Sequence, residues 1–134
     1  MSKLSMIEGI GEAYEAKLNA VGVNSVEALL EACITKKDRA ELAEKADISE
    51  KLILKWANHA DLFRVKGIAG QYAELLEAAG VDTVPELATR KAENLYKKML
   101  ETNEAKKLVK KAPTEGQVQD WIKQAAELPR ILKY

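Results

Sequence analysis

The sequence contains few of the residues that cross-link, break or disorder a chain. Cys33 is the only cysteine, so no disulfide can form within the chain, and only three prolines and seven glycines occur among 134 residues. With 47% hydrophobic residues, this composition excludes a disordered or collagen-like protein. No apolar run approaches the roughly 18 residues that a membrane span requires, and no charged leader with an apolar stretch begins the chain. We therefore expect a folded cytoplasmic protein without a membrane partner.

The sequence also lacks a set of residues suited to catalysis or metal binding. His59 is the only histidine, and no second histidine or cysteine lies at a spacing that would complete a zinc site. Cys33 lies between Ala32 and Ile34, which is typical of a small buried side chain rather than an activated thiolate. Because no nucleophile occurs together with a base, we expect no enzymatic activity and no resident metal or cofactor.

No charge of one sign dominates the chain. The 21 basic residues balance the 21 acidic residues, so the formal net charge is zero. A neutral protein has no overall field that draws it to nucleic acid or anionic lipid, and any such attraction must be local. The charge is unevenly divided, because residues 1–64 carry −2 and residues 65–134 carry +2.

The sequence does contain an internal repeat. Residues 7–29 align without a gap with residues 65–87, at a constant offset of 58. A second match follows each stretch, because Ser49 precedes Trp56 by seven residues and Thr114 precedes Trp121 by seven. We therefore predict two related units, residues 1–64 and 65–134. The identical pairs in the first match are Gly9/Gly67, Ile10/Ile68, Tyr14/Tyr72, Leu18/Leu76, Ala20/Ala78, Gly22/Gly80, Val23/Val81, Val26/Val84 and Leu29/Leu87.

Helical periodicity and capping residues predict an all-α fold, since no alternating β-branched run competes. Ser25, Thr35 and Ser49 are expected N-caps, Gly22 is expected just after a helix end, and Thr83 with Glu86 is expected to form a capping box. Each unit of about 60 residues would be only marginally stable alone, so we expect both to pack as one compact helical domain. The predicted helices are 12–21, 26–33, 37–46, 50–64, 70–79, 84–90, 92–102, 104–111 and 115–127.

The turn at Ile7 to Gly11 is the motif with the clearest binding potential. Two glycines around Ile10 let the chain reverse in few residues, since glycine tolerates positive φ and leaves its amide unshielded. Ile10 can then point inward while the backbone amides point outward. A helix begins at the same place, so its first N–H groups and the positive end of its dipole face one spot in solvent. Such a spot binds phosphate without reading base sequence.

At these residues the chain resembles the helix-hairpin-helix family, whose hairpin follows the pattern apolar-x-Gly-apolar-Gly. It also resembles a small prokaryotic family of unknown function that is built from tandem helix-hairpin-helix units, over most of residues 4–128. The first resemblance implies duplex DNA contact through hairpin amides to phosphates, sometimes with a monovalent cation held by hairpin carbonyls. The second implies a fold and no established activity. The hairpins implied by the match are Gly9, Ile10 and Gly11, and Gly67, Ile68, Ala69 and Gly70.

The two hairpins differ in their charged neighbours. Glu8, Glu12 and Glu15 surround the first, whereas Lys66 and Gln71 flank the second, in which Ala69 replaces the latter glycine. A helix N-terminus stabilises a bound anion by roughly 0.3–1 kcal/mol. One carboxylate about 8 Å away opposes it by about 0.5 kcal/mol even at the dielectric of bulk water. Two glutamates therefore cancel the benefit at the first hairpin, where they equally suit an ordinary first helical turn.

A lysine-rich stretch follows the second hairpin. In the predicted helix 104–111, lysines four residues apart lie on neighbouring faces and form one patch. This patch is either an ordinary solvated helix or a source of attraction for DNA phosphates. We expect a monomeric, non-catalytic module that binds the duplex DNA backbone; the alternative is a protein-protein adaptor or scaffold without nucleic-acid binding. The lysines concerned are Lys106, Lys107, Lys110 and Lys111.

Trp56 and Trp121 hold equivalent places in the two units, at a spacing that faces the predicted core. Core packing is the simpler interpretation, and stacking on nucleic-acid bases is the alternative. The segment from Leu42 to Ile53 also has the spacing of a helix-turn-helix. The helix that would enter the DNA groove, residues 50–64, carries few basic residues, and we expect no sequence-specific reading. The polar residues that this helix is expected to expose are Glu50, Lys51, Lys55, Asn58 and Asp61.

Overall fold

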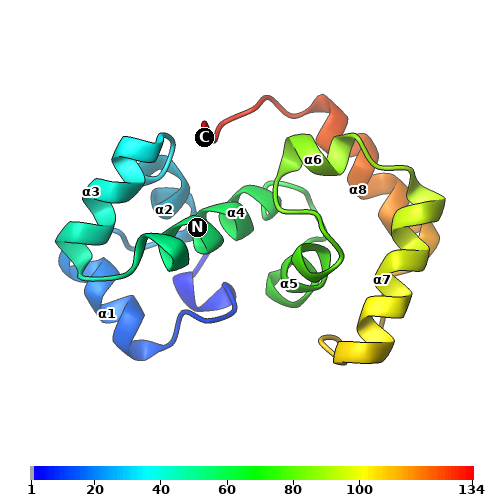
Figure 1. Cartoon of the computed structure of the whole chain (residues 1–134), viewed down its shortest axis with the longest axis horizontal. Helices are drawn as coiled ribbons and strands as arrows, with labels where there is room; N and C mark the ends of the chain where they lie inside the picture. The colour runs from blue at the N-terminus through cyan, green and yellow to red at the C-terminus, as the bar shows by residue number, and fades with distance from the viewer. Residues whose placement is uncertain (1) are drawn as a thin grey trace. The chain divides into compact units, whose positions relative to one another are not determined.

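The computed structural model describes residues 2–134, which form eight α helices, one short 3-10 helix and no strand (Figure 1). The all-α fold predicted from the sequence is confirmed. In chain order the elements are η1 (Leu4–Met6), α1 (Glu12–Ala20), α2 (Val26–Ala32), α3 (Lys36–Ala46), α4 (Glu50–Leu62), α5 (Gly70–Ala78), α6 (Val84–Ala88), α7 (Ala92–Lys106) and α8 (Glu115–Glu127).

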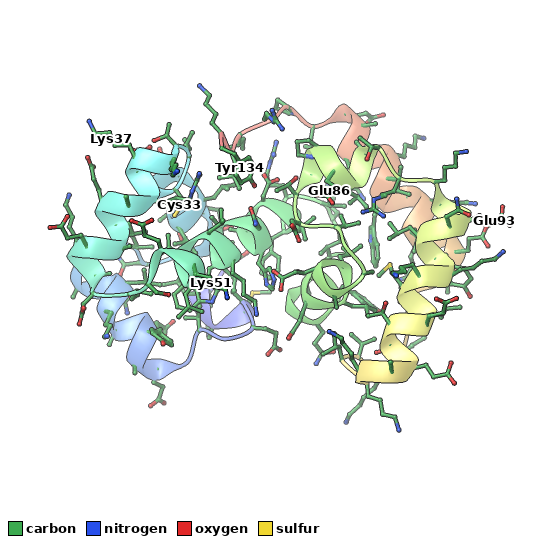
Figure 2. The ribbon with its side chains drawn as sticks, viewed as in Figure 1. Cys33, Lys37, Lys51, Glu86, Glu93 and Tyr134 are labelled. Atoms are coloured by element: carbon green, nitrogen blue, oxygen red, sulfur yellow. The ribbon has the colours of Figure 1, made fainter. Side chains whose placement is uncertain are left out.

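The contacts divide the chain into two compact units. Unit 1 extends to Asp61 and includes Ile131–Tyr134, and unit 2 is Leu62–Arg130. The last four residues belong to unit 1 because the N–H of Lys133 donates to the carbonyl of Ile34 at 2.7 Å. Tyr134, labelled in Figure 2, also donates from its hydroxyl to the side chain of Asn58. Proximity in the sequence alone would have assigned these residues to unit 2.

Local capping explains where α2, α3 and α4 of unit 1 begin. Ser25 Oγ accepts from the N–H of Ala28 at 3.0 Å, and Ser49 Oγ accepts from that of Leu52 at 3.2 Å. Thr35 and Asp38 form a full capping box at the start of α3. These bonds satisfy N–H groups that have no partner within their helix. The three predicted N-caps are therefore confirmed.

The core of unit 1 gathers large side chains from α1, α2 and α4. Leu18, Leu29, Ile53 and Trp56 have no exposed surface. Cys33, which follows α2, is also fully buried, and desolvation raises the pKa of its thiol to about 12. The expectation that Cys33 is a small buried side chain is confirmed.

Unit 2 packs α6 and α7 against α8, and α5 against α7. Its core includes Leu76, Leu87 and Met99, which are fully buried, and Trp121, which is 2% exposed. A capping box at the start of α8 joins Thr114 and Gln117. Both tryptophans are thus core residues, as their spacing indicated, and neither is exposed enough to stack on a base.

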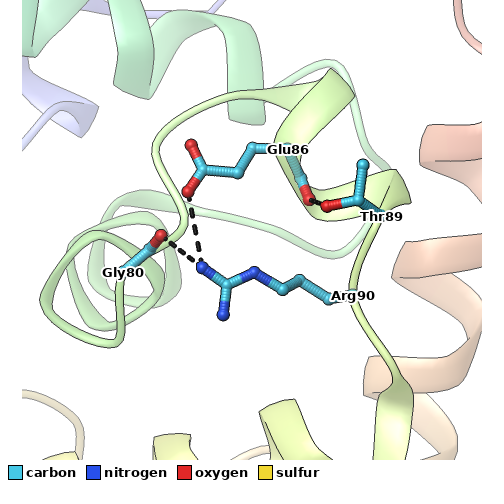
Figure 3. A network of polar contacts seen from close by, with 4 residues as sticks. All are labelled: Gly80, Glu86, Thr89 and Arg90. Atoms are coloured by element: carbon cyan, nitrogen blue, oxygen red, sulfur yellow. Dashed lines mark hydrogen bonds and ion pairs between the residues drawn. The ribbon is translucent and has the colours of Figure 1, made fainter.

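The predicted capping box of Thr83 and Glu86 is wrong, because the Thr83 side chain makes no capping bond at the start of α6. The Glu86 carboxylate instead faces Arg90, at 3.4 Å, and its carbonyl accepts from the Thr89 hydroxyl at 2.7 Å (Figure 3). Arg90 also donates to the carbonyl of Gly80 at 2.7 Å. The arginine draws the carboxylate away from the helix start, since a guanidinium is a stronger partner than a backbone amide.

The predicted helix 104–111 is wrong. A single helix, α7, runs to Lys106 and ends at Lys107, whose φ is +50°. The Asn103 side chain bonds to the backbone of Val109 in both directions, so the chain after α7 is held in a turn rather than a new helix. The lysines of this stretch therefore do not share helical faces.

A third correction concerns α4, on which Asn58 and Asp61 were expected to be exposed. They are 9% and 1% exposed. Asn58 is covered by Tyr134, a residue from the far end of the chain. Helical periodicity could not predict that contact, because it reports only which residues share a face.

Candidate functional site

The two glycine turns have the same backbone geometry. The first glycine turn is Gly9, Ile10 and Gly11, and the second glycine turn is Gly67, Ile68, Ala69 and Gly70. Gly9 and Gly67 have φ values of +96° and +98°, which other residues rarely adopt. The N–H of Ile10 donates to the carbonyl of Ile7 at 3.2 Å, and Ile68 makes the corresponding bond to Val65 at 3.2 Å. Each isoleucine is nearly buried, at 4% and 5% exposure, and each therefore anchors its turn in the core of its unit.

A tryptophan lies directly beneath each turn. A Cβ atom at Gly67 would be 2.9 Å from Nε1 of Trp121, and one at Gly9 would be 3.4 Å from Nε1 of Trp56. The tryptophans in turn contact tyrosines of the following helices, with ring centroids 5.1 Å apart for Tyr14 and Trp56. Glycine is thus favoured in each turn for two reasons: the backbone has a positive φ, and the indole ring approaches closely.

Neither turn places a side-chain cap on the helix that it begins. The N-cap residues of α1 and α5 are Gly11 and Ala69, which have no side-chain acceptor for the first N–H groups. Beside the second turn a further amide is occupied in addition to that of Ile68, because the N–H of Lys66 donates to Oε1 of Gln124 at 2.8 Å. The amide of Gln124 returns a bond to the Lys66 carbonyl at 3.1 Å. Any anion at this turn therefore meets the amides that follow Ile68.

The exposure of the turn residues limits which of them can touch a ligand. Gly9 and Gly11 are exposed in the first turn, and Gly67 and Ala69 are exposed in the second. Gly70 is buried, so its own surface offers little to a ligand although it begins α5. The residue that follows it, Gln71, is exposed.

The lysine loop, residues 106–111, joins α7 to the segment before α8. All four of its lysines are exposed, and within residues 2–134 none of them forms an ion pair. The loop is tied to α5 because the hydroxyl of Tyr72 donates to the carbonyl of Lys111 at 3.1 Å. Tyr72 lies in the first turn of α5, directly after the second glycine turn. The fold therefore brings the second turn and the lysine loop together within unit 2.

Two other basic residues of this region, Arg90 and Lys97, have acidic or backbone partners. Arg90 is held by Gly80 and Glu86, as described above. Lys97 lies 3.6 Å from Glu93, which points away from α7 in Figure 2. The excess of positive charge is thus concentrated in the lysine loop rather than spread along α7.

Acidic side chains surround the first glycine turn. Glu8 and Glu12 are exposed beside it, and Glu15 is half-buried. Glu12 and Glu15 lie in the first turn of α1, where carboxylates stabilise the helix dipole. The structure therefore keeps the contrast between the two turns that the sequence indicated.

Sequence reasoning missed Tyr72, Asn103 and Gln124 as parts of this site. Tyr72 was recognised only as a residue repeated in both units, and the bond that it makes joins residues 39 positions apart. Gln124 and Lys66 are 58 positions apart. Of the three, only Asn103 could have been noticed in the sequence, because an asparagine near a helix end often bonds to the backbone that follows.

The residues that the structure describes contain no group of three or more His, Cys, Asp or Glu side chains that could hold a metal ion. His59 is fully buried in α4. None of the helices formed by residues 2–134 is long and apolar enough to cross a membrane.

The fold and the site thus define a small all-helical protein with two glycine turns, each packed on a buried tryptophan. The second turn lies beside an exposed lysine loop. The chain belongs to the family described as a domain of unknown function, DUF4332, whose model matches residues 8–128. The expected membership of a family of unknown function is confirmed. No curated protein and no solved structure matches the chain.

Proposed function

We propose that this protein is a non-catalytic module that binds the backbone of duplex DNA through unit 2, without reading base sequence. The observation that supports it most is the bond between the Tyr72 hydroxyl and the Lys111 carbonyl, at 3.1 Å. It places four exposed lysines beside the helix that follows the second glycine turn. Phosphates are the groups that a set of amides and lysines without a reading side chain recognises.

The interpretation of both turns as helix-hairpin-helix hairpins belongs to this proposal. It is supported by the matching φ values of Gly9 and Gly67 and by the matching bonds of Ile10 and Ile68. In this interpretation the amides after Ile68 receive one phosphate, while the lysines attract the neighbouring phosphates. A monovalent cation at the turn carbonyls is not required, since the lysines supply positive charge.

The energies indicate that the lysines provide most of the affinity. A helix N-terminus stabilises an anion by only roughly 0.3–1 kcal/mol. Four lysines that each neutralise a phosphate release counterions, so the slope of log affinity against log salt is expected near about −3.6. Affinity should then fall about 150-fold between about 50 and 200 mM salt.

Charge also favours unit 2 over unit 1 as the binding unit. Unit 2 carries a formal charge of +2 and unit 1 carries −2. The exposed Glu8 and Glu12 repel a phosphate at the first turn, whereas Lys66 and Gln71 flank the second. We therefore assign DNA binding to the second turn and no phosphate to the first.

A fluorescence-anisotropy titration with a labelled duplex at several salt concentrations tests this proposal. The variant Lys106→Glu/Lys110→Glu should bind more weakly and with a slope about 1.8 shallower, because two phosphate contacts are lost. The matched control is Lys36→Glu/Lys37→Glu, which reverses two exposed charges on α3 of unit 1, where Lys37 extends outward (Figure 2). A flat salt response of the wild type, or equal losses in both variants, refutes the proposal.

A second variant tests the turn itself without disturbing its packing. Gln71→Glu adds a carboxylate at an exposed position in the first turn of α5, where it stabilises the helix dipole and repels a phosphate. We expect weaker duplex binding with unchanged folding. Ala13→Glu, at the matching exposed position of α1, is the control and should leave binding unchanged.

A second candidate function is a protein-protein adaptor or scaffold. It is favoured by the exposed carboxylates at the first glycine turn, which suit a basic partner protein rather than DNA. An adaptor should ignore both Lys106→Glu/Lys110→Glu and Gln71→Glu. Absence of duplex binding at low salt, with a defined partner retained through purification and lost in Glu8→Lys/Glu12→Lys, would support this function instead. The monomeric state and the cytoplasmic location stay predictions.

A further inference from the structure

We propose that Tyr72 and Asn103 are positioning residues that hold the lysine loop as a preformed surface for the phosphates of duplex DNA. The inference rests on the proposed function and adds to it two uncharged residues. Neither residue needs to touch DNA, because each bonds to the loop backbone rather than to its lysine side chains.

Asn103 holds the beginning of the loop. The chain leaves α7 in a left-handed conformation at Lys107, whose N–H donates to the Asn103 carbonyl at 2.7 Å. The Asn103 side chain then bonds to Val109 twice: its Nδ2 donates to the Val109 carbonyl at 3.1 Å, and its Oδ1 accepts from the Val109 N–H at 2.9 Å. Val109 is 7% exposed and anchors the loop in the core of unit 2. The loop thus has a defined path between its lysines.

Tyr72 holds the end of the loop. Its hydroxyl donates to the Lys111 carbonyl, while its ring packs on Trp121 with centroids 5.2 Å apart. Trp121 lies in turn beneath Gly67 of the second glycine turn. A continuous series of contacts therefore joins the turn that is proposed to receive a phosphate to the loop that carries the lysines.

The comparison with unit 1 separates this role from ordinary core packing. Tyr14 occupies the matching position in α1 and packs on Trp56 with ring centroids 5.1 Å apart. Within residues 2–134, however, its hydroxyl makes no hydrogen bond, and unit 1 has no lysine loop beside α1. The tyrosine ring is common to both units, whereas the hydroxyl bond is specific to the unit with the lysines.

A held loop strengthens binding because it has already lost much of the freedom that a mobile loop would lose on the DNA. Releasing it leaves the number of lysines unchanged. We therefore expect lower affinity with an unchanged salt slope, since the slope reports phosphate contacts and the intercept reports the ordering of the loop. Replacing a lysine should instead make the slope of log affinity against log salt shallower, because a phosphate contact is lost.

The variant Tyr72→Phe removes only the hydroxyl, and Tyr14→Phe is its matched control. For a bond worth about 1 kcal/mol, duplex affinity should fall about fivefold in Tyr72→Phe at constant slope. Tyr14→Phe should bind as the wild type does. Without DNA, limited trypsin digestion followed by mass spectrometry should show faster cleavage after Lys107, Lys110 and Lys111 in Tyr72→Phe but not in Tyr14→Phe.

Asn103→Ala provides a second test at the other end of the loop. Alanine favours the helix that precedes the turn, so α7 should stay folded while both bonds to Val109 are lost. Far-UV circular dichroism checks that folding. We expect faster trypsin cleavage of the loop and weaker duplex binding, again at the wild-type slope.

The outcomes distinguish this inference from the proposed function. If the wild type binds duplex and both variants keep its affinity, the positioning role is refuted and the proposed function stands. Unchanged trypsin cleavage in both variants also refutes the role, because the two bonds then do not hold the loop. If the wild type binds no duplex, the proposed function fails and this inference fails with it, whatever the digestion shows.

Discussion

The close approach of Gly67 to Trp121 gives a stability prediction that can be worked from the structure. We consider Gly67→Ala and Gly80→Ala, two substitutions in unit 2 at nearly the same backbone angle, φ +98° and +97°. At Gly67 the new Cβ atom would lie 2.9 Å from Nε1 of Trp121. At Gly80 it would lie 3.4 Å from the end of the flexible Arg90 side chain. Backbone strain should therefore lower the stability of both variants equally, whereas steric overlap with Trp121 should lower only that of Gly67→Ala.

Backbone strain acts equally on both variants. An alanine in the left-handed region costs roughly 1–2 kcal/mol, and the reduced freedom of the unfolded chain offsets about 0.4–1 kcal/mol of it. Gly80→Ala should thus lower the free energy of unfolding by about 1 kcal/mol. Gly67→Ala must also displace a buried indole ring, and overpacking of this kind adds about 1–3 kcal/mol. Its total loss should be about 2–4 kcal/mol.

Urea unfolding followed by far-UV circular dichroism measures both losses. Because the two glycines lie in the same unit, the same transition reports on both variants. We expect a clearly larger loss of unfolding free energy in Gly67→Ala than in Gly80→Ala. Equal losses would show that Trp121 shifts freely and that the turn is not packed against it as described.

Two further predictions concern unit 1. Tyr134→Ala should lower the free energy of unfolding by about 1–2 kcal/mol, because it removes the hydrogen bond to Asn58 and the ring 5.2 Å from the Arg39 guanidinium; urea unfolding that matches the wild type would contradict this. Burial raises the pKa of Cys33 to about 12, so the folded thiol should react with a disulfide reagent at neutral pH far more slowly than the urea-unfolded chain. Since the folded state holds this proton more tightly, the contribution of Cys33 to stability is full below its unfolded pKa of about 8.5. It is lost as pH rises toward about 12. Equal reaction rates in the folded and unfolded chain would show that the site opens readily.

The proposal also explains why the two turns can differ in function although they share a geometry. Their glycines, isoleucines and tryptophans serve the packing of each unit. The charged residues around them are free to vary, since they lie in solvent. Glu8 and Glu12 make the surface at the first glycine turn negative, whereas the lysine loop makes the surface beside the second turn positive.

Much of the local structure could be predicted from the sequence. Ser25, Thr35 and Ser49 cap helices as expected, and Gly22 has the positive φ of a residue after a helix end. These features depend on atoms within four residues of each other, so short patterns contain the necessary information. The tryptophans were also placed correctly, because helical spacing determines which face they share.

The sequence by itself therefore determined the all-α fold, the two glycine turns and the contrast in charge between them. The tertiary structure alone decided that Gln124 occupies the Lys66 amide, that Tyr72 meets Lys111, and that Tyr134 returns to unit 1. Each of these contacts joins residues at least 39 positions apart, and a single hydroxyl or amide makes it. Local propensities contain no information on such pairs, because they arise only when packed helices bring distant side chains within hydrogen-bond distance.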